Sequence, residues 1–230
     1  MKNLTKIFMA VAVAMFAFAC VTDTTEDLGI KVEGQGVTEL TLSLEESRTH
    51  LGEKAEGVYP LYWSEGDAIA VNGVASNPLT AGGSANADFK FNLELVYPIH
   101  AVYPASAAGE CSEGKVTVTV PAVQTLSGHT TASGALVSVA KAAGAALPFK
   151  NVTALLKVNV SVDGITEIVL QGKNDEVIAG TVKVDAATGV LSEVVAGSKM
   201  ITFKPEGETF AQGDYYIALL PTDFTKGFDL

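Results

Sequence analysis

Residues 155–162 read LLKVNVSV, and this stretch decides the fold class. Its apolar side chains Leu156, Val158, Val160 and Val162 alternate with lysine, asparagine and serine. Successive side chains of a β-strand point to opposite faces, so this alternation predicts a strand with one buried face.

The same period of two recurs on both sides of this stretch, whereas helical periodicity is nearly absent. The other alternating segments are residues 40–44, 69–71, 89–95, 99–103, 116–120, 182–184, 201–203 and 215–219. Glycine, asparagine, aspartate and proline separate most of them, as expected for turns. Many short strands at such spacing predict an all-β fold, either a sandwich or a barrel.

One stretch departs from this pattern. Residues 132–147 read ASGALVSVAKAAGAAL, and they are small and interrupted by glycine. We interpret them as a partly buried, irregular connection that could hold a short helical turn. The sequence therefore predicts an N-terminal β-sandwich domain at residues 37–147 and a C-terminal one at residues 148–230.

The N-terminus has the pattern of an export signal. Lys2 and Lys6 precede an apolar run at residues 7–19. Those 13 residues are too few for a membrane-spanning helix, which needs roughly 20. Small residues end the run, as a signal peptidase requires. We therefore predict that residues 1–19 form a signal peptide.

Cys20 follows this run directly, in the position at which lipoproteins are acylated. Acyl chains such as palmitate would anchor the protein to a membrane without a spanning helix. Residues 20–36 are then interpreted as an acidic tether. The alternative is an ordinary secretory signal followed by an incidental cysteine.

Charge and cysteine content exclude several classes of protein. The chain has 15 basic and 26 acidic residues, a net charge of −11. Because residues 1–19 carry two lysines and no acidic residue, their removal lowers the net charge to −13. Such a surface repels nucleic acid. Cys111 is the only other cysteine. With Cys20 acylated, neither a disulfide nor a thiolate metal site can form within one chain.

The residues that could carry catalysis or metal binding are scattered. His50, His100 and His129 lie far apart, and none has the spacing of a metal site. No serine lies in a nucleophile elbow, and no glycine-rich loop leads from a strand to a helix. We therefore expect no enzyme activity, no metal and no cofactor. The single tryptophan, Trp63, is interpreted as a core residue, and Asp67 as a turn residue that bonds backbone N–H groups.

Four stretches in this order resemble the fimbrillin-like family of Bacteroidales surface lipoproteins, which are subunits of type V pili (major and minor fimbrium proteins). They are SRTHL (47–51) with LYWSEGDAIAVNG (61–73), HAVYPAS (100–106) with VTVTVPAVQT (116–125), LPFKNVTALLKVNV (147–160), and GDYYIALLPTDFTKGFDL (213–230). The resemblance implies two consecutive transthyretin-like β-sandwich domains. It also implies a lipid-anchored protein at the outer membrane and the cell surface, with a role in cell adhesion or biofilm formation.

The resemblance gives the only arginine of the chain, Arg48, a specific role. In polymerising members of the family, a trypsin-like protease cuts after an arginine in this region, which here would make Thr49 the new N-terminus. Loss of the preceding strand leaves a groove that a strand of another fimbrial subunit fills. Main-chain hydrogen bonds then supply affinity, and alternate side chains fill pockets. The alternative is that Arg48 is a solvated residue of an uncleaved protein.

Two further points stay open at this level. Alternation restarts at Phe228 and Leu230, so we expect the second domain to be incomplete. Either the chain continues beyond Leu230 or a strand of another subunit completes the domain. The alternative function is a surface lipoprotein that stays monomeric and binds a glycan or a host protein. The role as stalk, anchor or tip and the adhesion target are not predicted.

Overall fold

The computed structural model describes residues 30–33, 37–43, 50–51, 61–92, 94–126, 131–144 and 146–230. The predicted signal peptide, the predicted lipidation residue Cys20 and the predicted cleavage residues Arg48 and Thr49 lie outside this part of the chain. Within it the protein is all-β, with one short 3-10 turn (η1, Ala105–Ala107) and no α-helix. The all-β prediction is therefore confirmed, and the several packed sheets are consistent with a β-sandwich.

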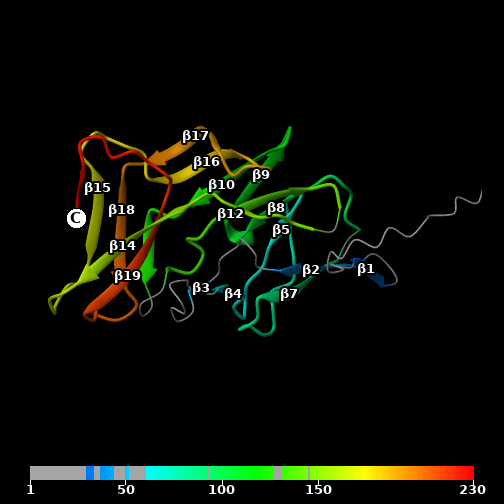
Figure 1. Cartoon of the computed structure of the whole chain (residues 1–230), viewed down its shortest axis with the longest axis horizontal. Helices are drawn as coiled ribbons and strands as arrows, with labels where there is room; N and C mark the ends of the chain where they lie inside the picture. Colours follow the sequence, from blue (N-terminus) through cyan, green and yellow to red (C-terminus); the bar gives the residue numbers. More distant parts are fainter. Residues whose placement is uncertain are drawn as a thin grey trace, which may run out of the picture.

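The sheets follow one another along the long axis of the molecule (Figure 1). One end carries the antiparallel sheet β1-β2-β7, and the central sheet follows in the order β13-β12-β8-β5-β6. The strands of the first sheet are β1 (Ile30–Glu33), β2 (Val37–Ser43) and β7 (Asn86–Phe91). Those of the central sheet are β5 (Ala70–Val71), β6 (Val74–Ala75), β8 (Ile99–Tyr103), β12 (Ser138–Ala142) and β13 (Lys150–Asn151). A two-residue pair, β3 (His50–Leu51) with β4 (Leu61–Tyr62), lies apart from both sheets.

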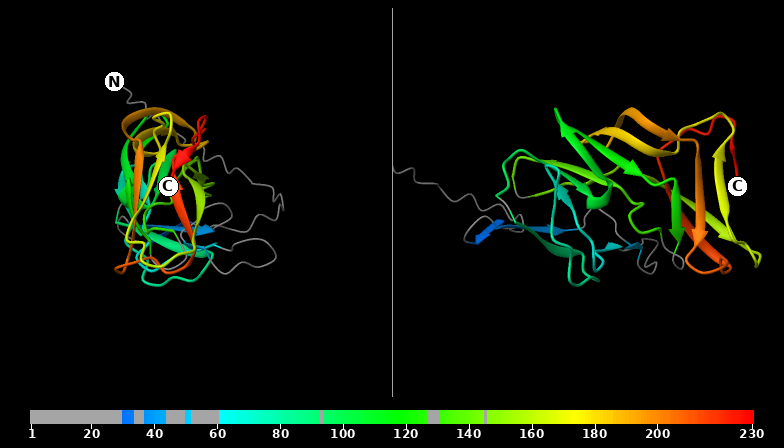
Figure 2. Two further views of the ribbon diagram at one scale, coloured as in Figure 1. Left: turned by 90° about the vertical axis from the view of Figure 1, so that its left-hand side faces the viewer. Right: turned by 180° about the vertical axis from the view of Figure 1, so that it is seen from behind.

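The other half of the molecule contains three further sheets (Figures 1 and 2). Their orders are β17-β16-β10-β9, β11-β18-β15-β20 and β14-β19. The first is built from β9 (Ala108–Ser112), β10 (Lys115–Val120), β16 (Ala179–Asp185) and β17 (Leu191–Ser198). The second is built from β11 (Val123–Leu126), β15 (Ile168–Gly172), β18 (Met200–Pro205) and β20 (Phe228–Asp229). The third consists of β14 (Ala154–Val160) and β19 (Gly213–Leu219), which pair in seven consecutive registers. Among the described strands, every pair is antiparallel except β11 with β18.

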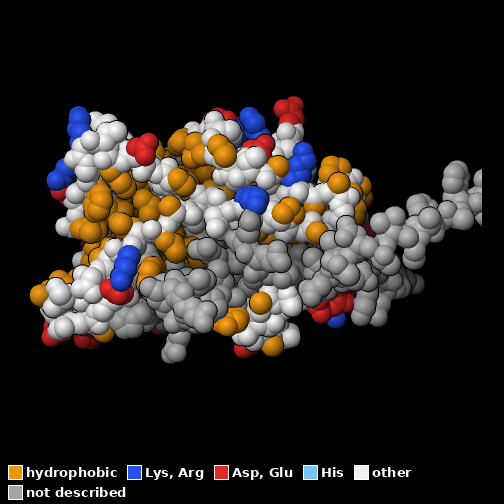
Figure 3. Space-filling view, viewed as in Figure 1, with side chains coloured by type: hydrophobic (Ala, Val, Ile, Leu, Met, Phe, Trp, Pro, Cys, Tyr) orange, Lys and Arg blue, Asp and Glu red, His pale blue; other side chains and the backbone are white. Residues whose placement is uncertain are grey.

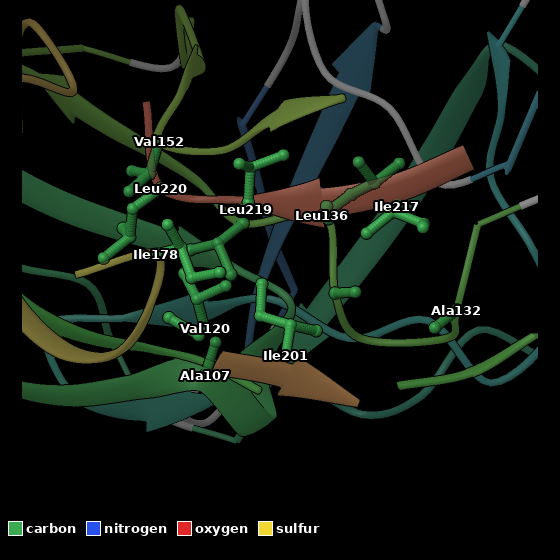
Figure 4. Close-up of a cluster of buried hydrophobic side chains, with 14 of the residues drawn as sticks. Ala107, Val120, Ala132, Leu136, Val152, Ile178, Ile201, Ile217, Leu219 and Leu220 are labelled. Carbon is green, nitrogen blue, oxygen red and sulfur yellow. The ribbon is translucent and has the colours of Figure 1, made fainter. Parts of the chain in front are cut away.

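The buried apolar side chains of the described residues form two hydrophobic cores. The first core lies between β2–β7 and the central sheet, and it contains Trp63, Phe89 and Phe91. The second core lies among the sheets of the other half and contains Phe203 and Phe210. Figure 4 shows how side chains of several strands, Val120, Ile201 and Ile217 among the labelled ones, meet in this second core.

A buried glutamine ties two sheets of the second half together. Gln124 on β11 is 1% exposed. Its Nε2 donates to the carbonyl oxygen of Ala218 at 2.6 Å, and the Ala218 N–H donates to its Oε1 at 3.2 Å. The side-chain amide thus satisfies both backbone groups of a β19 residue, as a neighbouring strand would.

The predicted irregular connection at residues 132–147 is wrong at its centre, because residues 138–142 form β12. This strand pairs with β8 over five residues, from Ser138↔Tyr103 to Ala142↔Ile99. Val139 faces the second core, whereas Ala140 and Ala142 face the first. A strand that is buried on both faces shows no alternation of apolar and polar residues, and this hides it in the sequence.

The strand pairing also crosses the predicted domain boundary at residue 147. β10 pairs with β16, and β11 pairs with β18, so strands from before residue 147 complete sheets formed after it. The sheets therefore do not divide at this residue.

The interpretation of residues 20–36 as a tether is wrong in part, because Ile30–Glu33 form β1, which pairs with β2. Ile30 and Val32 do alternate with charged residues, but four residues are too short a signal on their own.

Candidate functional site

The strand β2 and the surface that receives it form the candidate site. β2 pairs with β7 over six consecutive registers, with Leu40 opposite Phe89. Its other edge pairs with β1, where Ile30 lies opposite Leu40. β2 is therefore the middle strand of a three-stranded sheet at one end of the molecule (Figure 1).

Leu40 connects β2 to the first core. The side chain is 1% exposed and belongs to the same buried cluster as Trp63, Phe89 and Phe91. The Trp63 ring lies edge-on to Phe89, with the ring centroids 4.9 Å apart and an interplanar angle of 73°. Complete burial of a leucine side chain contributes about 1.5–3 kcal/mol. The aromatic rings thus form an apolar seat for one side chain of β2.

The neighbouring residue faces the opposite side of the sheet. Glu39 lies opposite Lys90 in the β2–β7 register, and the Lys90 Nζ is 3.6 Å from its Oε1. Because the lysine is well exposed, this ion pair contributes little to stability, about 0–1 kcal/mol. It does favour a strand with an acidic residue at this register over one with a basic residue, since like charges opposite each other are destabilising.

Trp63 is positioned by a turn and by a buried tyrosine. The Ser64 N–H donates to Asp67 Oδ2 at 2.6 Å, and the Tyr103 hydroxyl donates to Asp67 Oδ1 at 2.9 Å. Burial and the negative charge of Asp67 hold the pKa of Tyr103 far above its ordinary value. The interpretations of Trp63 as a core residue and of Asp67 as a turn residue are both confirmed.

The Trp63 indole Nε1 is buried and makes no hydrogen bond to any residue that the structure describes. Leaving a buried donor unpaired costs about 1–3 kcal/mol. The ring therefore stabilises the core through its apolar surface and its aromatic contacts. Tyr103 is its second edge-on neighbour, with the two ring centroids 5.4 Å apart.

The histidines and cysteines do not assemble into a site within the described residues. His100 lies on β8 opposite Lys141, and its pKa is lowered by burial and then by the positive charge of Lys141. Cys111 is a free, half-buried thiol whose pKa is raised by burial. In the part of the chain that the structure describes, no group of three potential metal-ligating side chains lies together.

The sequence pattern identified the two partners of the site separately. Residues 40–44 and 89–95 were both predicted as strands, and the structure brings β2 and β7 side by side. Arg48 and Thr49 follow β2 in the chain but lie outside the described residues, as does Cys20. The contact of Leu40 with the aromatic cluster could not be found from the sequence, because it joins residues about 50 positions apart.

Comparisons with protein-family models, with curated proteins and with solved structures find no match to this chain. A search of the described residues finds no helix of the length and apolar character needed to cross a membrane.

Proposed function

We propose that this protein is a cell-surface lipoprotein that acts as a fimbrial subunit and assembles by β-strand donation, for adhesion or biofilm formation. In this proposal the two cores belong to two transthyretin-like β-sandwiches that share strands. A lipid on Cys20 holds the unassembled protein at the outer membrane, and cleavage after Arg48 prepares it for assembly.

The placement of β2 carries the proposal. β1 and β2 lie on the N-terminal side of Arg48, whereas every other strand that lines the first core lies on its C-terminal side. One cut after Arg48 would therefore detach β1 and β2 from the rest of the chain while leaving the central sheet continuous. Within the described residues, the β1–β2 hairpin pairs with the rest of the chain through β7.

Loss of β2 would open two complementary features. The backbone N–H and C=O groups of β7 that now pair with β2 would be free to bind another extended strand. The space of Leu40, beside Trp63 and Phe89, would accept one apolar side chain of that strand. Register would follow from this apolar position, because a shift by one residue turns every side chain to the other face.

The experiment is N-terminal sequencing with intact mass, on protein recovered from the cell surface and on a sample treated with a trypsin-like protease. We expect an acylated Cys20 before treatment, and a new N-terminus at Thr49 with high-mass ladders that survive mild detergent afterwards. An Arg48→Gln variant is the matched control, because it removes the only arginine. This variant should stay uncut at this position and should form no ladder.

A peptide of residues 37–43 provides a second readout of the same site. Added in excess to the cleaved protein, it should bind and block ladder formation, because it restores the β2 pairing with β7. The same peptide with Leu40→Asp should bind much more weakly, since it would bring a carboxylate into the apolar seat. Cleavage without ladders, with no difference between the two peptides, would overturn strand donation. An acylated monomer that resists the protease would instead favour the binding lipoprotein that does not polymerise.

A further inference from the structure

The outer face of β7 carries one positive and one negative side chain. Lys90 and Asp88 are both exposed, whereas Phe89 between them is fully buried. Because side chains two positions apart on a strand share a face, Lys90 and Asp88 lie on the same surface of the sheet. Figure 3 shows acidic and basic side chains next to each other on the surface near β1, β2 and β7.

The strand β2 matches these two charges. Glu39 lies opposite Lys90, and Thr41 lies opposite Asp88. The Glu39 carboxylate is 3.6 Å from the Lys90 Nζ, and the Glu39 side chain is only 21% exposed. On the other edge of β2, the register places Lys31 of β1 opposite Glu39 as well. β2 therefore has an acidic residue where β7 is positive and a neutral residue where β7 is negative.

The apolar seat by itself leaves an alternative register open. A shift of β2 by one residue turns Leu40 to the outer face, but a shift by two residues keeps every side chain on its own face. In one such shift, Leu42 takes the position opposite Phe89 that Leu40 occupies in the native register. A leucine then still stands opposite the seat, so the apolar pattern does not distinguish this register from the native one.

The two charges of β7 do distinguish the shifted registers. The shift just described places Thr41 opposite Lys90 and breaks the ion pair with Glu39. A shift by two residues in the opposite direction places Glu39 opposite Asp88, and like charges directly opposite each other are destabilising. The native register is thus the one that satisfies the apolar seat and the charges together. Such pairing disfavours competing strand registers.

We propose that Lys90 and Asp88 determine which strand of another subunit can take the place of β2. The accepted strand has an acidic residue directly before its apolar anchor and no acidic residue directly after it. Selection of this kind rests on the proposed function, because it acts on a strand that has been exchanged. It also sets the spacing of the subunits, since a strand bound two residues out of register would move its subunit by about 7 Å along β7.

Charge reversals in the uncut full chain test the two contacts, with Arg48→Gln present in every variant. Glu39→Lys and Lys90→Glu should each raise the equilibrium constant for urea unfolding by up to about fivefold, the upper value for an exposed ion pair. In the double variant the charges are opposite again, so its unfolding constant should be at least about threefold below the product expected from the single variants.

The second position is tested with a neutral residue of matched size. Thr41→Glu brings a carboxylate opposite Asp88, so it should destabilise the uncut chain more than Thr41→Gln does. In an Asp88→Asn background, this difference between the two variants should disappear.

Strand selection is measured on the chain after treatment with the trypsin-like protease. The peptide of residues 37–43 and its Glu39→Lys form compete for the parent chain and for the Lys90→Glu chain. At low salt we expect the parent chain to bind the parent peptide about threefold to fivefold more tightly, and the Lys90→Glu chain to prefer the Glu39→Lys peptide. Both preferences should fade at about 1 M salt, where the Debye length is only about 3 Å.

The outcomes separate charge selection from strand donation. The same order of peptide binding on both chains would overturn charge selection and leave strand donation standing. Effects of Glu39→Lys and Lys90→Glu that multiply without coupling in the uncut chain would also overturn it. If no peptide binds to either chain, strand donation is overturned, and the selection of another subunit's strand falls with it.

Discussion

The strands β2 and β12 both join their sheets through antiparallel pairs, but they are buried in different ways. β12 has the first core on one face and the second core on the other, through Ala140 and Val139 respectively. On β2, Leu40 reaches the first core, whereas Glu39 lies at the surface with Lys90. The residues of β12 therefore belong to both cores, whereas β2 contributes to the first core through Leu40. The four predictions that follow test this difference.

The largest effect is expected for a charge placed on β12. Val139→Asp puts a carboxylate at a fully buried position of the second core, on a strand that also supports the first. A buried, unpaired charge is among the few changes that cost more than about 4–5 kcal/mol, so we expect loss of the folded state. Urea unfolding followed by circular dichroism measures this. Val96→Asp, at an exposed valine, is the control and should change stability by less than about 0.5 kcal/mol. A folded Val139→Asp variant with both cores intact would refute the view that β12 holds the two cores together.

A cavity in the first core should have the next largest effect. Trp63→Ala removes the ring that contacts both Phe89 and Tyr103, and we expect a loss of about 3–5 kcal/mol in the free energy of unfolding. Trp63→Phe keeps an aromatic ring and removes the unpaired indole N–H, so its loss should be smaller. A change within about 0.5 kcal/mol for Trp63→Ala would contradict the core role.

The sequence was sufficient for part of this comparison. Alternation identified β2, β7 and β8, because each has a buried face and a polar face or a clear bounding turn. It did not identify β12, whose small residues are buried on both sides. It could not show that β10 pairs with β16, since more than 60 residues separate Val118 from Val182 and only the folded chain joins them. The strand β17 was missed for a related reason: its extra residues Ser192 and Val195 break the period of two.

In the candidate site, the roles of single residues were predicted from the sequence, whereas the contacts between distant residues were not. The burial of Trp63 was expected, because a single large apolar ring is most stable when buried. The fit of Leu40 against it depends on the pairing of β2 with β7, a long-range contact that no local pattern encodes. The role of Asp67 as a turn residue was predicted, but its second hydrogen bond, from the Tyr103 hydroxyl, joins residues 36 positions apart.

A smaller change on β2 tests whether this strand is exchangeable. In the intact chain, Leu40→Ala should lower the free energy of unfolding by about 2–3 kcal/mol, the lower part of the range for a buried leucine. After cleavage at Arg48 and release of residues 1–48, the variant and the parent have the same sequence. Their stabilities should then be equal. A difference of about 2 kcal/mol that persists after proteolysis would mean that the cut segment remains bound, and this would argue against exchange.

The smallest effect concerns pH at the central sheet that the two cores share. Burial and Lys141 lower the pKa of His100 in the folded protein below its unfolded value of about 6.5. Between these two pKa values the unfolded chain binds more protons, so stability rises with pH. The contribution is therefore fully present above about pH 6.5 and decreases as the pH falls toward the folded pKa. Every other titratable group is the same in both proteins, so a His100→Gln variant isolates the histidine. The free energy of unfolding should fall more for the parent than for His100→Gln between about pH 7.5 and pH 5. Parallel pH profiles would show that His100 is solvated well enough to accept a proton next to Lys141, and that this part of β8 is less tightly enclosed than β12.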